Sequence, residues 1–280
     1  MCSRFSSVRP LASEAEYAAT EKAVTDFLRE GGEGEKLQQL LLKHSDAEWA
    51  QGRNWLENWW LQFAYLLWPD PLPLYSNVFF YFITTPTAEH IFQAARLLST
   101  FLDAKTKIDR EELPVEFTGN LPMDMCQHKR AFTTARIPGP NGDELRVLEP
   151  AGHVVVICNH RLFQIPAVDA NGTKICSQVF ERLLRQVWAE AHARMPRVHH
   201  SVALLTSEKR PVWAQWRKEL ERDNRATLET IDRALLVLVL EDEEPSSHDD
   251  ALRAIAGGDA NNRWFDKVGH SVCFSVGHCC

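Results

Sequence analysis

The 280-residue sequence has no uninterrupted run of about 18 apolar residues, so no membrane-spanning helix is predicted. It also has no excess of positive charge: its formal net charge is −7, and non-specific binding to nucleic acid is not expected. Its first ten residues include Arg4 and Arg9 but no apolar segment after them, so they do not predict a secretory signal. A Gly-rich phosphate loop is missing too, because Gly257-Gly258 lacks the helix and spacing of such motifs.

Cysteine is present but is not arranged as a disulfide framework. The seven cysteines are an odd number, and they are scattered before a final group near the end of the sequence. This pattern predicts reduced thiols in an intracellular protein. We expect Cys158 and Cys176 to pack as small apolar groups. The remaining composition, 45% hydrophobic and 25% charged, is typical of a soluble globular protein.

The densest local signal is Arg53-Asn54-Trp55-Leu56-Glu57-Asn58-Trp59-Trp60. Trp55 and Trp59 are four residues apart and share one helical face, which Leu56, Trp60 and Phe63 widen. An apolar stripe this heavy predicts a helix, from about Gly52, that is buried against a sizeable core.

Helices are predicted over residues 13–67. Ser13 and Glu16 form a capping box that begins the first helix, and Gly31-Gly32 ends it. Leu37, Leu40 and Leu41 mark a second helix, and the tryptophan-rich helix follows. We therefore expect three helices at the front of the chain.

Residues 68–150 are predicted to be largely irregular. The proline-rich segment Trp68–Pro73 stops the helices, and residues 77–82 form a short strand or a buried loop. Ile91, Ala95, Leu98 and Leu102 have the spacing of one helix. The polar segment Lys105–Pro150 is expected to cross the surface with short turns.

Residues 151–245 change to an α/β pattern. Val154–Ile157 and Phe163–Val168 predict a hairpin, in which Pro166 places the second strand at an edge. A long helix is predicted over 175–195, and Leu235–Leu240 is typical of a central strand. The other expected elements are a buried strand at Val202–Leu205, a helix around Trp213 to Leu220, and a short helix at Leu228 and Ile231. The fold class is therefore α/β, with a helical lead followed by one mixed sheet flanked by helices.

Several polar clusters are better explained without a catalytic role. His199-His200 precede a predicted strand and are expected at the surface, and Glu241–Glu244 is a charge run that predicts a solvated face. Structural zinc sites show two separated ligand pairs, and the adjacent Cys279-Cys280 makes a poor chelate. We therefore predict no metal site among the metal-ligand side chains near the end, which are His270, Cys273, His278, Cys279 and Cys280.

Several segments, in order, resemble the first half of the choline/carnitine O-acyltransferases, over roughly Arg9 to Lys267. Arg53–Trp60 is the strongest single match. The others are Arg9-Pro10-Leu11 with Glu16-Tyr17, Leu113–Glu116, Met125-x-Gln127, Arg136–Gly139, Val154–Val168, Leu205-Thr206-Ser207 with Trp213-Ala214, and Asn262–Lys267. The resemblance divides the chain into a partial acyltransferase N-terminal domain at 1–267 and an aberrant tail at 268–280.

The resemblance implies acyl transfer between coenzyme A and the hydroxyl of carnitine or choline. In that family one histidine is the general base on the hydroxyl, and a hydroxyl donor stabilises the oxyanion. Acyl-coenzyme A is then a co-substrate, no tightly bound cofactor is expected, and the partners are small molecules. A mitochondrial or peroxisomal location is also implied, although the family resemblance does not choose between them.

The chain departs from the family pattern at the catalytic motif. The family histidine lies in His-x-x-x-Asp/Glu-Gly, and no such motif occurs in these 280 residues. His270 comes too early after Lys267 and lacks the Asp-Gly, so no catalytic residue is assigned. Gln127 and His128 are the only substrate-proximal residues that the resemblance implies, and His128 stands where many members have tyrosine.

Two functions follow as hypotheses. The first is the N-terminal part of a carnitine O-acyltransferase-like enzyme, inactive as written because the resemblance places the coenzyme A groove and most of the carnitine pocket in the second half. The second is a truncated binding or regulatory module without catalysis. Residues 268–280 are expected to have no regular packing against the body, because the sheet neighbours of their family counterpart are missing.

Overall fold

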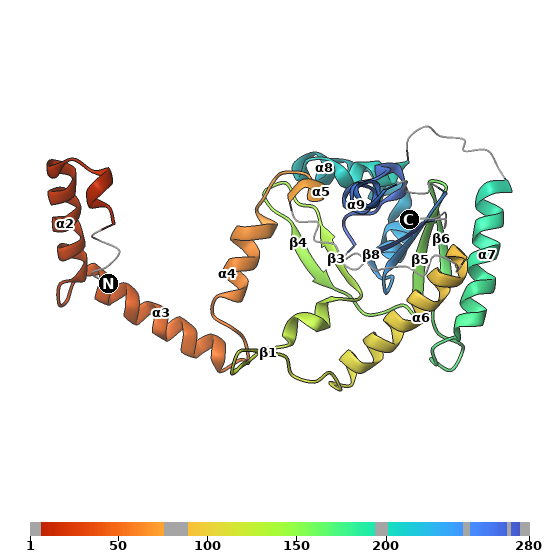
Figure 1. Cartoon of the computed structure of the whole chain (residues 1–280), viewed down its shortest axis with the longest axis horizontal. Helices are drawn as coiled ribbons and strands as arrows, with labels where there is room; N and C mark the ends of the chain where they lie inside the picture. The colour runs from red at the N-terminus through yellow and green to blue at the C-terminus, as the bar shows by residue number, and fades with distance from the viewer. Residues whose placement is uncertain (1–6, 76–88, 194–200, 243–246, 268–269, 275–280) are drawn as a thin grey trace. The chain divides into compact units, whose positions relative to one another are not determined.

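The computed structural model describes residues 7–75, 89–193, 201–242, 247–267 and 270–274, and the chain divides into two compact units (Figure 1). The first unit is Met1–Ala64 and the second is Tyr65–Cys280. Two predicted features, the strand or loop at 77–82 and His199-His200, lie outside the described residues. Among the described helices, none combines the length and the apolar composition that crossing a membrane requires.

The first unit is helical, as predicted. Ser13 caps α2 (Glu14–Leu28) through its side chain, and Glu16 completes the capping box. Gly32 is the N-cap of α3 (Glu33–Trp49), so Gly31-Gly32 separates the two helices as expected. The chain continues through α4 (Glu57–Leu61) and a π-helical turn (Gln62–Leu66).

The prediction that the tryptophan-rich helix is buried is wrong. Trp59 is 44% exposed, Trp60 is 59% exposed and Phe63 is 70% exposed. Trp55 is half-buried and meets Trp59 edge-on, with ring centroids 6.0 Å apart. The physical reason is that α2, α3 and α4 bury none of their residues, so the unit has no core to cover the indoles.

The segment between the helical unit and the main sheet holds one long helix, α6 (His90–Asp109), and several short elements. The short elements are α5 (Leu72–Tyr75), the antiparallel pair β1 (Phe117–Thr118) and β2 (Leu121–Pro122), and the antiparallel pair β3 (Thr134–Ile137) and β4 (Glu144–Val147). The helix predicted from Ile91 to Leu102 is confirmed. The expectation of a surface path holds for the exposed β1–β2 pair but is wrong for β3, because Thr134, Ala135 and Arg136 are buried.

The main sheet has the order β6-β5-β7-β8. Its strands are β5 (His153–Cys158), β6 (Arg161–Pro166), β7 (Val237–Glu241) and β8 (His270–Phe274). β5 pairs antiparallel with β6 and parallel with β7, which confirms the hairpin, the edge position of Pro166 and the central strand. The mixed α/β fold predicted from the sequence is confirmed.

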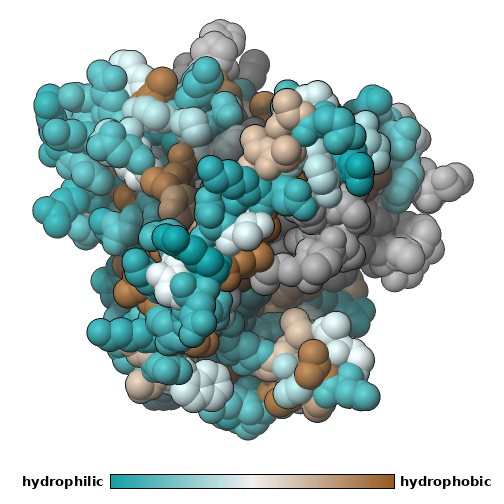
Figure 2. All heavy atoms as spheres, turned by 90° about the vertical axis from the view of Figure 1, so that its left-hand side faces the viewer, coloured by the Kyte–Doolittle hydropathy of each residue, from teal (hydrophilic) through white to brown (hydrophobic). Residues whose placement is uncertain are grey.

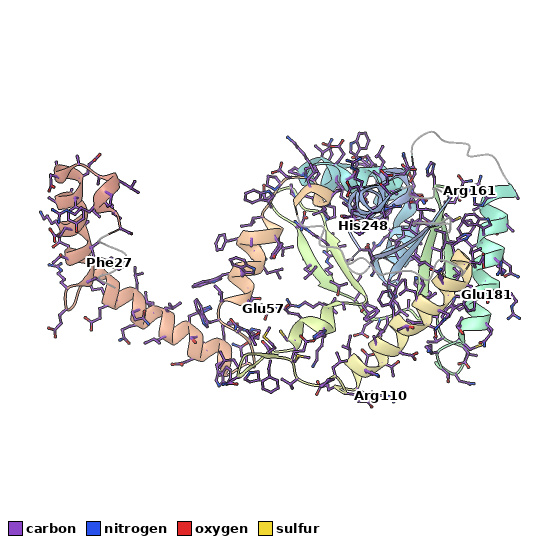
Figure 3. The ribbon with its side chains drawn as sticks, viewed as in Figure 1. Phe27, Glu57, Arg110, Arg161, Glu181 and His248 are labelled. Carbon is purple, nitrogen blue, oxygen red and sulfur yellow. The ribbon has the colours of Figure 1, made fainter. Side chains whose placement is uncertain are left out.

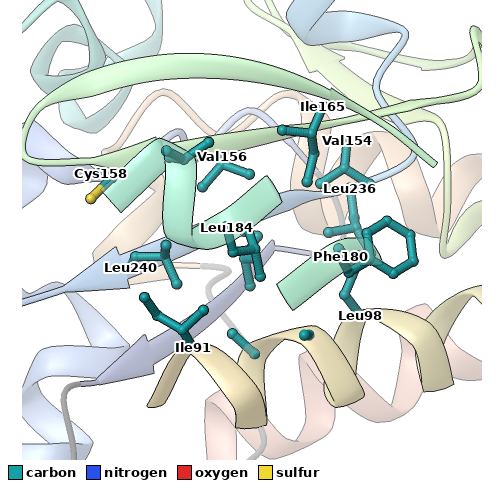
Figure 4. Packing of buried hydrophobic residues seen from close by; sticks show 14 of the residues in the cluster. Ile91, Leu98, Val154, Val156, Cys158, Ile165, Phe180, Leu184, Leu236 and Leu240 are labelled. Atoms are coloured by element: carbon teal, nitrogen blue, oxygen red, sulfur yellow. The ribbon is translucent and has the colours of Figure 1, made fainter. Parts of the chain in front are cut away.

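Helices cover both faces of this sheet (Figure 1). On one face α6 and α7 (Ser177–Ala193) bury Leu98, Phe180 and Leu184 against Val154 and Leu240, as the close view in Figure 4 shows. On the other face α8 (Arg210–Asp232) buries Trp213 and Ile231 against the opposite sides of β5 and β7. The alternation of buried side chains along β5 and β7 supplies both layers, which is why these strands contain almost no polar residue.

Three local predictions fail. Val202–Ser207 is a 3-10 helix rather than a strand, because Ser201 caps its start and Thr206 bonds back to the carbonyl of Ala203. The short helix expected at Leu228 and Ile231 is the second part of α8, after a non-helical residue at Asn224. The prediction that residues 268–280 have no regular packing is wrong for His270–Phe274, which pair in parallel with the whole of β7. The separate status of residues 268–280 stays a prediction.

Candidate functional site

Gln127 and His128, the substrate-proximal residues implied by the resemblance, lie on a 3-10 helix, Cys126–Arg130. Met125, just before it, takes a left-handed conformation with φ 65°. Gln127 is exposed and His128 is half-buried, with His128 Nε2 3.7 Å from Glu116 Oε1. Among the described interactions, no ion pair of the main sheet involves Gln127 or His128. The proximity of these two residues to a substrate therefore stays a prediction.

The most prominent polar feature is a buried ion network that sequence reasoning missed. Asp143 Oδ2 accepts hydrogen bonds of 2.6 Å from Nε of both Arg136 and Arg210. Nη2 of Arg210 lies 2.8 Å from Asp266 Oδ1, and Arg217 donates to Asp232 over 2.5 Å. We call these six residues the buried ion network: Arg136, Asp143, Arg210, Arg217, Asp232 and Asp266.

Burial sets the electrostatics of this network. Burial raises the pKa of Asp266 and of Asp232, and the neighbouring guanidinium groups of Arg210 and Arg217 oppose that rise. Burial also lowers the pKa of Lys267 to about 8. Lys267 Nζ donates a hydrogen bond of 2.6 Å to the carbonyl oxygen of Asp232, so this buried amine also has a hydrogen-bond partner. The groups pair closely with one another, although Arg210 Nη1 and Asp232 Oδ1 are buried without a hydrogen-bond partner among the described residues, and the burial of the network indicates a structural role.

The network joins segments that are distant in the sequence. Arg136 lies on β3, while Arg210 and Arg217 lie on α8. Arg136 also donates to the carbonyl of Tyr65 over 2.6 Å, and its own amide bonds to the carbonyl of Asp266 over 2.7 Å. Buried charges tolerate only partners with exact geometry, so the network fixes how β3, α8 and the Asn262–Lys267 segment meet.

A second polar region lies where the parallel strands β5 and β7 end. Asn159 and His160, which connect β5 to β6, have φ 46° and 60°. Asn262 holds this strained turn, because its Oδ1 accepts from the amide of His160 and its Nδ2 donates to the carbonyl of Leu240. His160 Nε2 lies 2.5 Å from Asp259 Oδ2. Burial alone would raise the pKa of Asp259, but bonds from Asn261 and His160 hold it below its ordinary value.

The acidic run is less solvated than predicted. Glu241 is half-buried and forms an ion pair with the buried Arg263, and Asp242 pairs with His192 on α7. The prediction of a solvated face is therefore wrong for Glu241 but holds for Asp242, which is exposed, and residues 243–246 lie outside the described ranges.

The thiols differ from one another. Cys158, the last residue of β5, is buried, and burial raises the pKa of its thiol to about 12, so it packs as predicted and stays protonated. Cys176 is exposed, and the prediction that it packs is wrong. Within the described ranges, no three His, Cys, Asp or Glu side chains gather as they would around a metal ion. His278, Cys279 and Cys280 lie outside those ranges.

The comparison with known families settles the relationship that the motifs suggested. The sequence model described as Choline/Carnitine o-acyltransferase matches residues 2–280. The chain belongs to this family. Its match extends past Lys267 to the last residue, so the family relationship covers the β8 segment as well as the motifs that precede it.

Curated relatives in the acyltransferase family align with nearly all of the chain. Carnitine O-acetyltransferase from Mus musculus is 30% identical over 294 residues, which cover 97% of this chain and 45% of the relative. Peroxisomal carnitine O-octanoyltransferase is 33% identical in Mus musculus, covering 98% and 47%, and 32% identical in Homo sapiens, covering 97% and 46%. The chain spans less than half the length of these relatives.

The second family motif in this chain, Asn262–Lys267, serves the fold. Trp264 is buried in the core beside Trp213, Asp266 belongs to the buried ion network, and Asn262 holds the β5–β6 turn. The motif residues were visible in the sequence, but their partners were not. Asp143, Arg210 and Asp232 carry no local pattern that distinguishes them from surface charges.

Proposed function

We propose that the whole protein to which this sequence belongs transfers an acyl group between coenzyme A and carnitine. One observation carries the proposal: the relatives that align with 97–98% of the chain are named carnitine acyltransferases, for both acetyl and octanoyl groups. The family relationship supports acyl transfer in general. The choice of carnitine over choline rests on the names of those relatives, and acyl-coenzyme A is the proposed co-substrate.

The proposed reaction needs a base, an oxyanion donor and a pocket for two reactants. A histidine removes the proton of the carnitine hydroxyl, and the oxygen attacks the thioester carbonyl. The bond between the carbonyl carbon and sulfur then breaks, and the thiol of coenzyme A leaves with the proton. Gln127 and His128 are proposed to lie near the alcohol, at the surface of the described body.

We propose further that the 280 residues alone do not catalyse this transfer. The family histidine motif does not occur in the sequence, and the buried ion network is closed to substrate. His270 belongs to β8, at a strand position rather than in a His-x-x-x-Asp/Glu-Gly turn. The proposed location of the whole protein is mitochondrial or peroxisomal, after the functions of its relatives.

The experiment that tests the transfer uses the protein encoded by the mature transcript. Thiol release from acetyl- and octanoyl-coenzyme A is measured with carnitine, with choline and with neither alcohol. The expected result is release that depends on carnitine, with little release for choline. Choline-dependent release, or no alcohol-dependent release with either thioester, would contradict the proposal.

The second candidate is a binding or regulatory module without catalysis. The pairing of His270–Phe274 with β7 favours it, because that pairing extends the main sheet beyond the last recognised motif. The transcript beyond the Lys267 codon separates the two candidates. A continuous frame that encodes a strand and His-x-x-x-Asp/Glu-Gly supports the enzyme, whereas a stop codon shared by the mature message supports the module.

A further inference from the structure

Two histidines flank one tryptophan where three elements of the second unit end. Trp188 and His192 lie in the last two turns of α7, and His90 is the first residue of α6. The ring centroids of Trp188 and His192 are 4.3 Å apart, and those of His90 and Trp188 are 4.6 Å apart. Asp242, which directly follows β7, reaches His192 from the sheet. We call these four residues the Trp188 cluster.

The hydrogen bonds of His192 require a protonated ring. Its Nδ1 is 2.7 Å from the carbonyl oxygen of Trp188, and its Nε2 is 2.8 Å and 3.0 Å from the two carboxylate oxygens of Asp242. Both nitrogens therefore face acceptors. A neutral imidazole donates from only one nitrogen, so only the imidazolium satisfies both bonds.

His90 is placed for the opposite charge state. Its Nε2 is buried without a hydrogen-bond partner, and its Nδ1 is 3.7 Å from Glu89 Oε1, beyond hydrogen-bond distance. Glu89 Oε2 caps α6 and pairs with Arg185 of α7 over 2.8 Å, whereas Oε1 is the oxygen that faces His90. The His90 ring is largely removed from water and has no hydrogen bond among the described interactions, so burial favours its neutral form.

We propose that the Trp188 cluster is a proton-sensitive latch that joins the first turn of α6, the last turn of α7 and the end of β7. The latch is closed when His192 is an imidazolium and His90 is neutral. In that state Trp188 has one cation against its ring and one uncharged ring on another side. Protonation of His90 puts a partly desolvated charge in the contact, balanced only by Glu89 Oε1 at 3.7 Å and not by a hydrogen bond, and deprotonation of His192 removes a hydrogen bond to Asp242 or to the α7 backbone.

The pKa directions agree with this arrangement. Burial would lower the pKa of His192, but the hydrogen bonds to Asp242 and to the Trp188 carbonyl, with the charge of Asp242, raise it above its ordinary value. Burial lowers the pKa of His90, against the charges of Glu89 and Asp242 and together with that of Arg185. Cys158 is the other titratable group beside Asp242, and with its pKa at about 12 it stays neutral across the range concerned.

The latch therefore has a pH optimum. His192 contributes stability that is fully present below its unfolded pKa of about 6.5 and lost as the pH rises through its higher folded value. His90 contributes stability that is present above about 6.5 and lost as the pH falls through its lower folded value. Both contributions are present together only near pH 6.5.

The test uses the full 280-residue chain with carbon-13-labelled histidine. Ring resonances are followed by NMR from pH 5 to pH 9, and His90 and His192 are assigned by the loss of a signal in His90→Gln and His192→Gln. The expected result is that His192 titrates above 6.5 and His90 below it. In Asp242→Asn, His192 is expected to titrate closer to that ordinary value, whereas in Asp223→Asn, which removes an exposed acid of α8, it is expected to stay where it is in the wild type.

Hydrogen exchange tests whether the titration closes a latch. Protection factors for the first turn of α6 and the last turn of α7 are expected to be highest near pH 6.5. Asp242→Asn is expected to lower those of α7 by about twofold to fivefold, the range of a part-exposed ion pair. His192 titrating at or below 6.5 in the wild type, or helix protection that does not change with pH, would overturn the proposal. The wild-type titration decides the first point even where a variant fails to fold.

Discussion

The indole Nε1 of Trp213 donates a hydrogen bond of 2.6 Å to Oδ2 of Asp266, and both side chains are completely buried. This bond joins α8 to the family motif Asn262–Lys267. The other oxygen of Asp266 lies 2.8 Å from Arg210, so one carboxylate links the hydrophobic core to the buried ion network. The motif that marks the family is thus a cross-link of the fold.

Replacing Asp266 by Asn should strongly destabilise the second unit. The change keeps the shape of the side chain but leaves Arg210 and Arg217 buried without their shared counter-charge, which costs about 3–5 kcal/mol for a broken buried pair. Urea unfolding measures the loss. Asp223→Asn, an exposed site on α8, is the control and should change stability little. A loss no larger than that of the control would show that Asp266 is uncharged in the fold.

Two tryptophan substitutions compare the buried core of the second unit with the exposed helices of the first unit. Trp264 is 1% exposed, and Trp264→Ala should cost about 3–5 kcal/mol. Trp55 is only half-buried against Trp59, so Trp55→Ala should cost clearly less. Denaturant melts of both variants give the comparison. Equal losses would mean that the tryptophan-rich helix is covered in solution.

Lys267 should make stability rise with pH in the alkaline range. Burial lowers its pKa to about 8, whereas an unfolded lysine has a pKa of about 10.4. Between these values the unfolded chain binds more protons than the folded chain, so the free energy of unfolding increases with pH. From pH 8 to pH 10, the free energy of unfolding of the wild type should therefore increase relative to that of Lys267→Met. A constant difference, as expected for the exposed Lys218→Met, would contradict the burial of a neutral amine.

The sequence predicted those elements whose signal is local. The capping box at Ser13, the β5–β6 hairpin and the apolar run Leu235–Leu240 each carry their own pattern, and all three are confirmed. The spacing of Ile91 to Leu102 likewise predicted α6. Hydrophobic periodicity and capping act over a few residues, so one segment is enough to reveal them.

The failures are of a different physical kind. The Val202–Ser207 segment has the residues of a strand, but hydrogen bonds from Ser201 and Thr206 turn it into a 3-10 helix. The tryptophan-rich helix has a strongly apolar face, but the sequence pattern of one helix does not show whether another element packs against that face. The buried ion network depends on contacts between residues far apart in the sequence, such as Asp143 and Arg210, which are 67 positions apart, and no local pattern records such contacts.

The exposed apolar side chains of the first unit predict dye binding. Trp49 is 81% exposed, and Trp60 and Phe63 are also exposed; hydrophobic residues appear among hydrophilic ones on the face in Figure 2. Purified chain should bind a hydrophobic dye or self-associate. Replacing Trp49, Trp60 and Phe63 by Gln should reduce the dye signal. The control is Asn58→Gln, a change of an exposed polar residue that should leave the dye signal unchanged. Asn58 follows Glu57, which is labelled in Figure 3. A clean monomer without dye binding would contradict this expectation.

The central proposal is that the 280 residues alone do not carry out the acyl transfer proposed for the whole protein. The direct measurement is thiol release from acetyl- and octanoyl-coenzyme A by the purified 280-residue chain, with and without carnitine, beside a carnitine O-acetyltransferase as positive control. Positioning both reactants supplies a large part of such a barrier, and no described group of this chain provides a base and a pocket together. The account predicts no carnitine-dependent release above the uncatalysed rate. Carnitine-dependent release that His270→Ala abolishes would contradict it and would make His270 the base.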